Sequence, residues 1–170
     1  MTGKVVGTVN EINPQPHGKG RRIGIAVARF NTEVTEMLLA GCREALVDCG
    51  VADGDITLAR VPGAWELPLA CQQMVAIGRY DAVIALGAVV RGETAHFEFI
   101  SGECARGLMQ LSADTGVPVA FGVLTPENGE QARYRADPAR GNKGREVALA
   151  ALEMVDLADL LADAGVADGS

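Results

Sequence analysis

The sequence is poor in aromatic residues, in histidine and in positive charge. Aromatic side chains make up 4% of its 170 residues, and only two residues are histidines. Fifteen lysines and arginines face 22 aspartates and glutamates, which gives a formal net charge of −7. Nonspecific binding of nucleic acid requires a basic face, so this balance argues against a nucleic-acid partner. An anionic ligand must instead be held by a few local cations and backbone N–H groups.

Long apolar runs are also missing. The longest, residues 82–90, has about half of the roughly 20 residues that a membrane-spanning helix needs. The first ten residues contain no apolar core of the kind that a secretory signal has. We therefore expect no membrane partner and a cytoplasmic location. The four cysteines have no C-x-x-C spacing and lie in apolar helical patterns, which predicts buried free thiols: Cys42, Cys49, Cys71 and Cys104.

The composition is typical of one globular domain with a substantial core. Hydrophobic residues make up 48% of the chain, and the mean hydropathy is +0.16. A positive mean hydropathy indicates that some apolar surface is buried between subunits. We divide the chain into an N-terminal arm (1–21), an α/β domain (22–161) and a frayed tail (162–170). The β-prone segment 5–9 either pairs with a sheet edge on another subunit or is disordered.

From residue 22 onward, strand patterns alternate with helical patterns. Apolar runs predict strands over 23–28, 56–61, 82–90 and 117–124, and a helical repeat follows each of them. Thr125, Pro126 and Glu127 are predicted to begin a short helix that reaches Arg135, and Asn142 is predicted to cap the last helix. Four strand–helix units predict an α/β fold, a flavodoxin-like three-layer sandwich whose four-stranded parallel sheet has helices on both faces.

In such folds ligands bind beyond the carboxyl ends of the strands. That rule selects the loops 29–31, 62–66, 91–96 and 125–126. In the third of these, an apolar strand runs into a glycine turn at Gly92 and then into a helix that begins at His96. Free backbone N–H groups at a helix start form an anion site, and the histidine beside it could couple proton transfer to phosphate binding.

Each candidate residue also has a structural interpretation. Phe30 either stacks on a flat heterocycle or packs as a hydrophobic staple for the helix that follows it. Glu66 either accepts hydrogen bonds from ligand hydroxyls or complements the dipole of the next helix. His96 either acts as a base, kept neutral by the positive end of the helix dipole, or is a partly buried surface histidine. For His96 the adjoining turn favours the functional interpretation.

Two nucleotide motifs are absent. Gly141-Asn142-Lys143-Gly144 resembles a phosphate loop only superficially, because the G-x-x-x-x-G-K-[ST] spacing is missing. No G-x-G-x-x-G turn follows the first predicted strand, so dinucleotide binding is unsupported.

Five segments taken together resemble the lumazine synthase (6,7-dimethyl-8-ribityllumazine synthase) family over about residues 22–158. They are residues 28–31, 61–68, 87–96, 115–122 and 141–144. The resemblance implies condensation of 5-amino-6-ribitylaminouracil with 3,4-dihydroxy-2-butanone 4-phosphate in riboflavin biosynthesis. It implies release of phosphate and water, no cofactor, and a pentamer that can assemble into a 60-subunit shell, with riboflavin synthase as a further partner.

The resemblance also implies a role for each site residue. Phe30 would stack on the pyrimidine, His96 would transfer protons, and Arg135 would bind phosphate. The ribityl chain would lie against Ala64, Trp65 and Glu66, the ring beside the backbone of Val89 and Val90, and the phosphate at Gly92, Glu93 and Thr94. A neighbouring subunit would contribute Phe121, Arg135 and Lys143.

The sequence departs from the family pattern at Trp65, where a smaller residue is common, and at Ala95, where proline or threonine is common. Both changes bear on ligand fit. Two other functions share features of the chain. A non-catalytic flavin-binding shell could use Phe30 equally well, whereas a flavodoxin-like electron carrier would need a Ser/Thr-rich loop where residues 29–31 stand.

Overall fold

The computed structural model describes residues 9–167 and contains one four-stranded parallel sheet in the order β2-β1-β3-β4. The strands are β1 (Ile23–Ala28), β2 (Ile56–Val61), β3 (Ala82–Ala88) and β4 (Val119–Leu124). β1 and β3 lie in the middle of the sheet, and β2 and β4 form its edges. The predicted parallel sheet is thereby confirmed.

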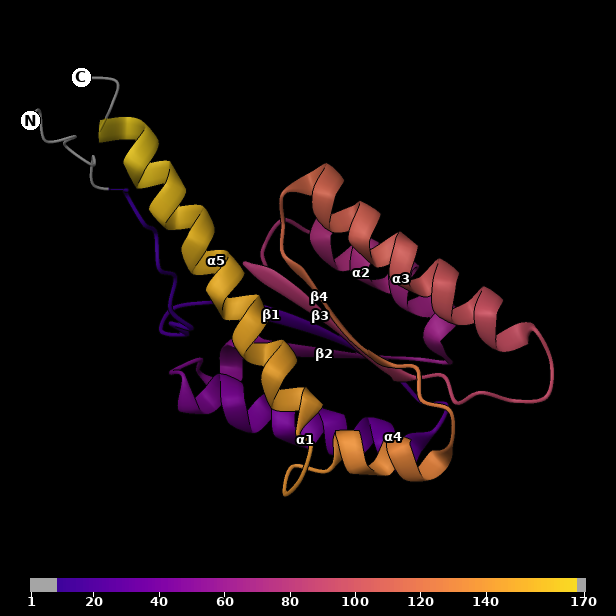
Figure 1. Ribbon diagram of the computed structural model, residues 1–170. Coiled ribbons are helices and arrows are strands. Elements are labelled where there is room, and N and C mark those ends of the chain that lie inside the picture. Colours follow the sequence, from indigo (N-terminus) through magenta and orange to yellow (C-terminus); the bar gives the residue numbers. More distant parts are fainter. Residues whose placement is uncertain (1–8, 168–170) are drawn as a thin grey trace, which may run out of the picture.

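Helices cover both faces of the sheet (Figure 1), which confirms the three-layer α/β fold. One layer contains α1 (Thr32–Asp48), α4 (Gly129–Ala136) and α5 (Lys143–Ala167). The other contains α2 (Leu67–Ala76) and α3 (His96–Thr115). Two short 3-10 turns, η1 (Asp53–Asp55) and η2 (Ala64–Glu66), lie on either side of β2 in the chain.

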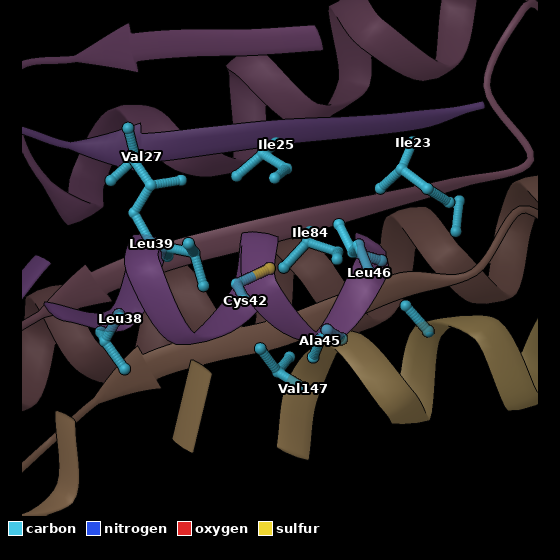
Figure 2. Close-up of a cluster of buried hydrophobic side chains, with 14 of the residues drawn as sticks. Ile23, Ile25, Val27, Leu38, Leu39, Cys42, Ala45, Leu46, Ile84 and Val147 are labelled. Atoms are coloured by element: carbon cyan, nitrogen blue, oxygen red, sulfur yellow. The ribbon is translucent and has the colours of Figure 1, made fainter. Parts of the chain in front are cut away.

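The core consists of two apolar clusters, one on each face of the sheet. Ile23, Ile25 and Val27 point from β1 toward α1 and α5 (Figure 2), and they are completely buried. Alternate residues of the same strand, Ala26 and Ala28, pack against α2 and α3 instead. A strand buried on both faces has no polar side, which is why β1 and β3 appear in the sequence as continuous apolar runs.

Several predicted boundaries shift. β3 ends at Ala88 rather than at residue 90, and β4 begins at Val119, after Pro118, rather than at residue 117. The helix cap predicted at residues 125–127 is wrong. α4 begins at Gly129, and the Asn128 side chain caps it by accepting a 2.9 Å hydrogen bond from the backbone N–H of Gln131. The segment before Asn128 is held instead by the Pro126 carbonyl, which accepts a 3.0 Å hydrogen bond from the Arg91 N–H.

The arm and the C-terminal helix contact each other. The backbone N–H of Gln15 donates to Asp156 Oδ2 at 2.7 Å, and Arg21 pairs with Asp159. α5 continues to Ala167. Residues 162–167, which the sequence predicted to belong to the tail, are therefore helical. Of the β-prone segment 5–9, all but Val9 lies outside the described residues, and Val9 is 90% exposed.

All four cysteines are free. Burial raises the pKa of the Cys42 and Cys71 thiols to about 12 and that of Cys104 to about 11, so all three are inert at neutral pH. Cys49 is only half-buried, at the end of α1, so the prediction of burial is wrong for this residue. None of the helices described over residues 9–167 has the length and apolar character needed to cross a membrane.

The two glycines around Lys143 have a packing role. α1 and α5 pack closely, and a Cβ on Gly144 would overlap the Leu38 carbonyl oxygen and lie 2.9 Å from the Cys42 nitrogen. A Cβ on Gly141 would lie 2.7 Å from the Arg135 Cα. Side chains are excluded at both positions because two backbone segments approach each other there. The glycines thus hold the start of α5 against α1 and the end of α4.

Gly144→Ala is therefore expected to destabilise the protein. Alanine favours helix by about 1 kcal/mol over glycine, but overlap with backbone atoms should outweigh this gain and give a net loss of about 1–3 kcal/mol. Urea unfolding followed by circular dichroism measures the change. Gly54→Ala is the control, because a Cβ there meets no atom within 4 Å. Equal stability of the two variants would show that α5 can move away from α1 at little cost.

Candidate active site

The candidate site lies at the carboxyl edge of the sheet between β1 and β3. The chain runs outward from β1 to β2 and then returns to the other side of β1 for β3, so the strand order reverses at this point. In open α/β sheets ligands bind in the crevice formed there. Two of the four predicted ligand loops, 29–31 and 91–96, follow these two strands.

A cavity of about 170 Å³ occupies this position. The predicted site residues among its lining are Phe30, Ala64, Val89, Val90, Gly92, Thr94 and His96. Ala88, Phe97 and Ile100 complete the lining and were not predicted. Phe97 and Ile100 belong to the apolar stripe of α3, so their signal in the sequence is the same as that of ordinary core residues.

Backbone hydrogen bonds fix the loop that carries Phe30. The Phe30 N–H donates to the Pro62 carbonyl at 3.0 Å. Asn31 follows in the left-handed conformation (φ 60°), and its side-chain amide donates to the Ala88 carbonyl at 2.8 Å. Phe30, which lines the cavity, is 71% exposed. A hydrophobic staple would bury the ring, so its exposure favours the stacking interpretation.

The loop after β2 contributes less to the cavity than the sequence indicated. Ala64 is buried and lines it. The Glu66 carboxylate accepts a 2.9 Å hydrogen bond from the Gly63 N–H, so one of its oxygens bonds within the turn that contains Glu66. Trp65 is 58% exposed and lines a separate hollow of about 290 Å³ with Pro68 and Leu69. Neither Glu66 nor Trp65 lines the cavity between β1 and β3.

The turn before α3 has the features of an anion site. Within residues 9–167, no protein acceptor lies within hydrogen-bonding range of the backbone N–H groups of residues 92–95. They stand at the positive end of the dipole of α3, which favours a negative charge there. His96 is exposed, and its N–H makes only a long contact of 3.4 Å to Thr94 Oγ1. Glu93, the remaining predicted residue of the turn, is exposed and does not line the cavity.

Arg91 is a functional candidate that the sequence reasoning left without a role. Its guanidinium pairs with Glu98 in the first turn of α3 and, through Nε, with Glu127 Oε2 at 2.7 Å. The guanidinium also lies 4.2 Å from the centre of the Phe97 ring. In the sequence, Arg91 can be recognised only as a charged residue next to Gly92. This position does not indicate which residues Arg91 contacts.

The other three predicted residues lie elsewhere on the chain. Phe121, on edge strand β4, and Lys143 line a hollow of about 420 Å³, and Arg135 lines one of about 340 Å³. The two hollows share Val123 and Leu124 as lining residues. One chain therefore carries two separate groups of predicted residues.

The cations of this second group differ in their partners. Lys143 Nζ lies 2.5 Å from Glu146 Oε2, one turn further along α5. Arg135 is exposed and forms no ion pair with any residue that the structure describes. Over residues 9–167, no cluster of three or more histidine, cysteine, aspartate or glutamate side chains is placed to hold a metal ion.

Comparison with known proteins identifies the family. The model of the 6,7-dimethyl-8-ribityllumazine synthase family matches residues 20–159. A protein of Gemmatimonas aurantiaca named 6,7-dimethyl-8-ribityllumazine synthase is 51% identical over 149 residues, which are 88% of this chain and 91% of the relative. The chain therefore belongs to the 6,7-dimethyl-8-ribityllumazine synthase family and is a transferase of riboflavin biosynthesis.

Proposed function

We propose that this enzyme condenses 5-amino-6-ribitylaminouracil with 3,4-dihydroxy-2-butanone 4-phosphate and releases phosphate and water. The observation that carries the proposal is the cavity between β1 and β3. It combines the exposed Phe30 ring, the free N–H groups of residues 92–95 and His96. The reaction needs a place for a flat ring, a phosphate site and a group that moves protons, and these are the three features.

The first substrate, the pyrimidine, lies on Phe30 in this proposal. Its ring extends along the backbone of Val89 and Val90, where β3 has ended and the chain lines the cavity. The ribityl chain follows the segment of Ala64, Trp65 and Glu66. Because the Glu66 carboxylate bonds to the Gly63 N–H through one oxygen, its other oxygen is left for a ribityl hydroxyl.

The second substrate places its phosphate at Gly92, Glu93 and Thr94. The N–H groups of the turn and the dipole of α3 act on the anion, while the Glu93 carboxylate remains exposed. His96, one residue beyond the turn, transfers protons during imine formation and ring closure. Holding both substrates side by side supplies much of the remaining rate, since an intramolecular arrangement replaces a bimolecular encounter.

Phe121, Arg135 and Lys143 act in the site of a neighbouring subunit. Their position in hollows apart from the His96 cavity supports this division. Arg135 then reaches the phosphate that leaves during the reaction, and its planar fork of donors suits that anion. The reaction uses no cofactor in this proposal, because proton transfer and positioning account for every step.

This division requires an oligomer. We propose a pentamer in the cytoplasm, able to assemble as twelve pentamers into a shell and to associate with riboflavin synthase. Light scattering after size exclusion should give at micromolar concentration a multiple of the 17.7 kDa subunit mass that corresponds to a pentamer or to a 60-subunit shell. The mass of one subunit would contradict both the oligomer and the shared site.

The activity is tested with both substrates together and with each one omitted. Formation of the lumazine, followed by its absorbance, should match the release of inorganic phosphate mole for mole. A flavin-binding shell is the alternative, because the exposed Phe30 ring could stack on a flavin as well as on a pyrimidine. Tight binding of flavin without turnover would establish that alternative and overturn the synthase.

A further inference from the structure

The turn that receives the phosphate in the proposed function has few internal supports. Gly92 has open space on its side-chain face, with no atom within 4 Å of a Cβ built there. The only hydrogen bond within the turn is the 3.4 Å contact from the His96 N–H to Thr94 Oγ1. An anion site works best when its N–H groups already point at the ligand. The support for residues 92–94 must therefore come from outside the turn.

Arg91 connects the turn to two other elements. Its backbone N–H donates to the Pro126 carbonyl at 3.0 Å, in the loop between β4 and α4. Its side chain pairs with Glu127 in that same loop and with Glu98 on α3. The guanidinium packs over Phe97, which lines the cavity. One residue thus fixes the start of the turn to the loop before α4 and to the first turn of α3.

The charges around Arg91 indicate that it is not a phosphate ligand itself. The two carboxylates that it contacts outnumber its single positive charge, and each takes a different nitrogen of the guanidinium, Glu98 at Nη1 and Glu127 at Nε. Hydrogen bonding from Arg91 holds the pKa of Glu98 below its usual range, so this carboxyl stays ionised at neutral pH. An incoming phosphate would have to displace an ionised carboxylate from the guanidinium.

We propose that Arg91 is a positioning residue that holds the phosphate turn in its binding geometry through Glu127 and Glu98. This inference rests on the proposed function, because it concerns the phosphate site of that reaction. A single exposed ion pair stabilises little. The Arg91 side chain, however, forms two ion pairs and a cation–π contact. Together these contacts restrict the geometry of the short turn that follows Arg91.

The sharpest test is Glu127→Gln, because two models predict opposite signs for it. If Arg91 bound phosphate directly, removal of a competing negative charge would tighten phosphate binding. If Arg91 positions the turn through Glu127, the loss of the pair should weaken binding. We expect Arg91→Met, which removes both pairs and the cation–π contact, to raise the KM for the butanone phosphate roughly five- to thirtyfold. Glu127→Gln, which removes one pair, should raise it about two- to fivefold, and the KM for ribitylaminouracil should change less than about threefold in both variants.

A double variant tests whether Arg91 and Glu127 act through the same contact. Arg91→Met with Glu127→Gln should be little worse than Arg91→Met alone, since Arg91→Met already removes the pair with Glu127. Arg106→Met is the matched control, because Arg106 also pairs with a glutamate on α3 but contacts neither loop. Tighter phosphate binding in Glu127→Gln, or additive effects in the double variant, would overturn the proposal.

A second measurement keeps this inference separate from the proposed function. The amides that can report this are those of residues 89 and 91, which donate to the Leu124 and Pro126 carbonyls. Their hydrogen exchange, followed by NMR without substrate, should be faster in Arg91→Met and Glu127→Gln and unchanged in Arg106→Met. If the native enzyme lacks turnover, the proposed function fails, and exchange still decides whether Arg91 holds the turn. If turnover is normal and neither variant alters KM or exchange, only the role of Arg91 fails.

Discussion

Replacement of His96 by alanine should lower turnover roughly ten- to a thousandfold, which is somewhat below the usual range for loss of a general acid–base group. The reduction is limited because much of this reaction depends on holding two substrates together. Binding of ribitylaminouracil should change little, since Phe30 and the backbone near Val89 hold the ring in the proposed site. Single-turnover kinetics with both substrates, together with a binding titration of the pyrimidine alone, measure the two effects.

The chain provides its own control for this experiment. His17, the other histidine, is exposed in the N-terminal arm and does not line the cavity. His17→Ala should retain the turnover of the unmodified enzyme. Imidazole added to His96→Ala should restore part of the lost activity, because the missing side chain leaves space at the open cavity. Turnover of His96→Ala equal to that of the unmodified enzyme would reassign His96 to a structural role.

The fold could be predicted from the sequence wherever one physical rule dominates. β1 and β3 are buried on both faces, so their sequences are continuous apolar runs that no polar residue interrupts. Gly50 and Gly78 follow the ends of α1 and α2 with positive φ angles, as the sequence pattern of a helix end predicts. These features depend on a residue and its nearest neighbours, which is why they can be recognised without the rest of the chain.

The errors arose where partners distant in the sequence compete. Thr125 and Pro126 form a good local helix start, but the Arg91 N–H donates to the Pro126 carbonyl, and α4 begins only after Asn128. Local reasoning also gives no partners for the arm, in which Gln15 and Arg21 contact carboxylates about 140 residues away on α5. Contacts of this kind cannot be derived from local propensity.

The candidate site divides in the same way. The position of Phe30 and His96 follows from the rule that ligands bind beyond the carboxyl ends of parallel strands, and the structure brings both to one cavity. Nothing local to Arg91 indicates that it contacts Glu98 and Glu127, since these pairings depend on how two loops meet. The location of Arg135 away from the cavity is likewise a property of the complete fold.

Replacement of Arg135 by alanine should weaken the use of the phosphate substrate by about 1.5–3 kcal/mol, the range for a hydrogen bond to a charged group. The chain carries a net charge of −7, so the phosphate depends on a few local cations and on the start of α3. Arg135 is suited to this role because no described residue pairs with it. Affinity for a ribityl ligand without phosphate should stay nearly constant.

Arg133→Ala is the matched control. Arg133 lies two residues earlier on α4, and its contact with Glu33 is long, at 3.9 Å. Its replacement removes the same charge from the same helix without removing the proposed phosphate ligand. The KM for the butanone phosphate should therefore rise in Arg135→Ala and remain near the native value in Arg133→Ala. An unchanged KM in Arg135→Ala would show that another group binds the phosphate.

Mixing the His96→Ala and Arg135→Ala subunits tests whether one site takes these residues from two chains. Each variant alone should be impaired at every site. In a co-refolded oligomer with equal amounts of both, a site is intact when one neighbour supplies His96 and the other supplies Arg135. With random assembly about a quarter of the sites meet this condition, so activity should recover to about that fraction. No recovery would place both residues in the site of a single chain, and the shared active site would then be wrong.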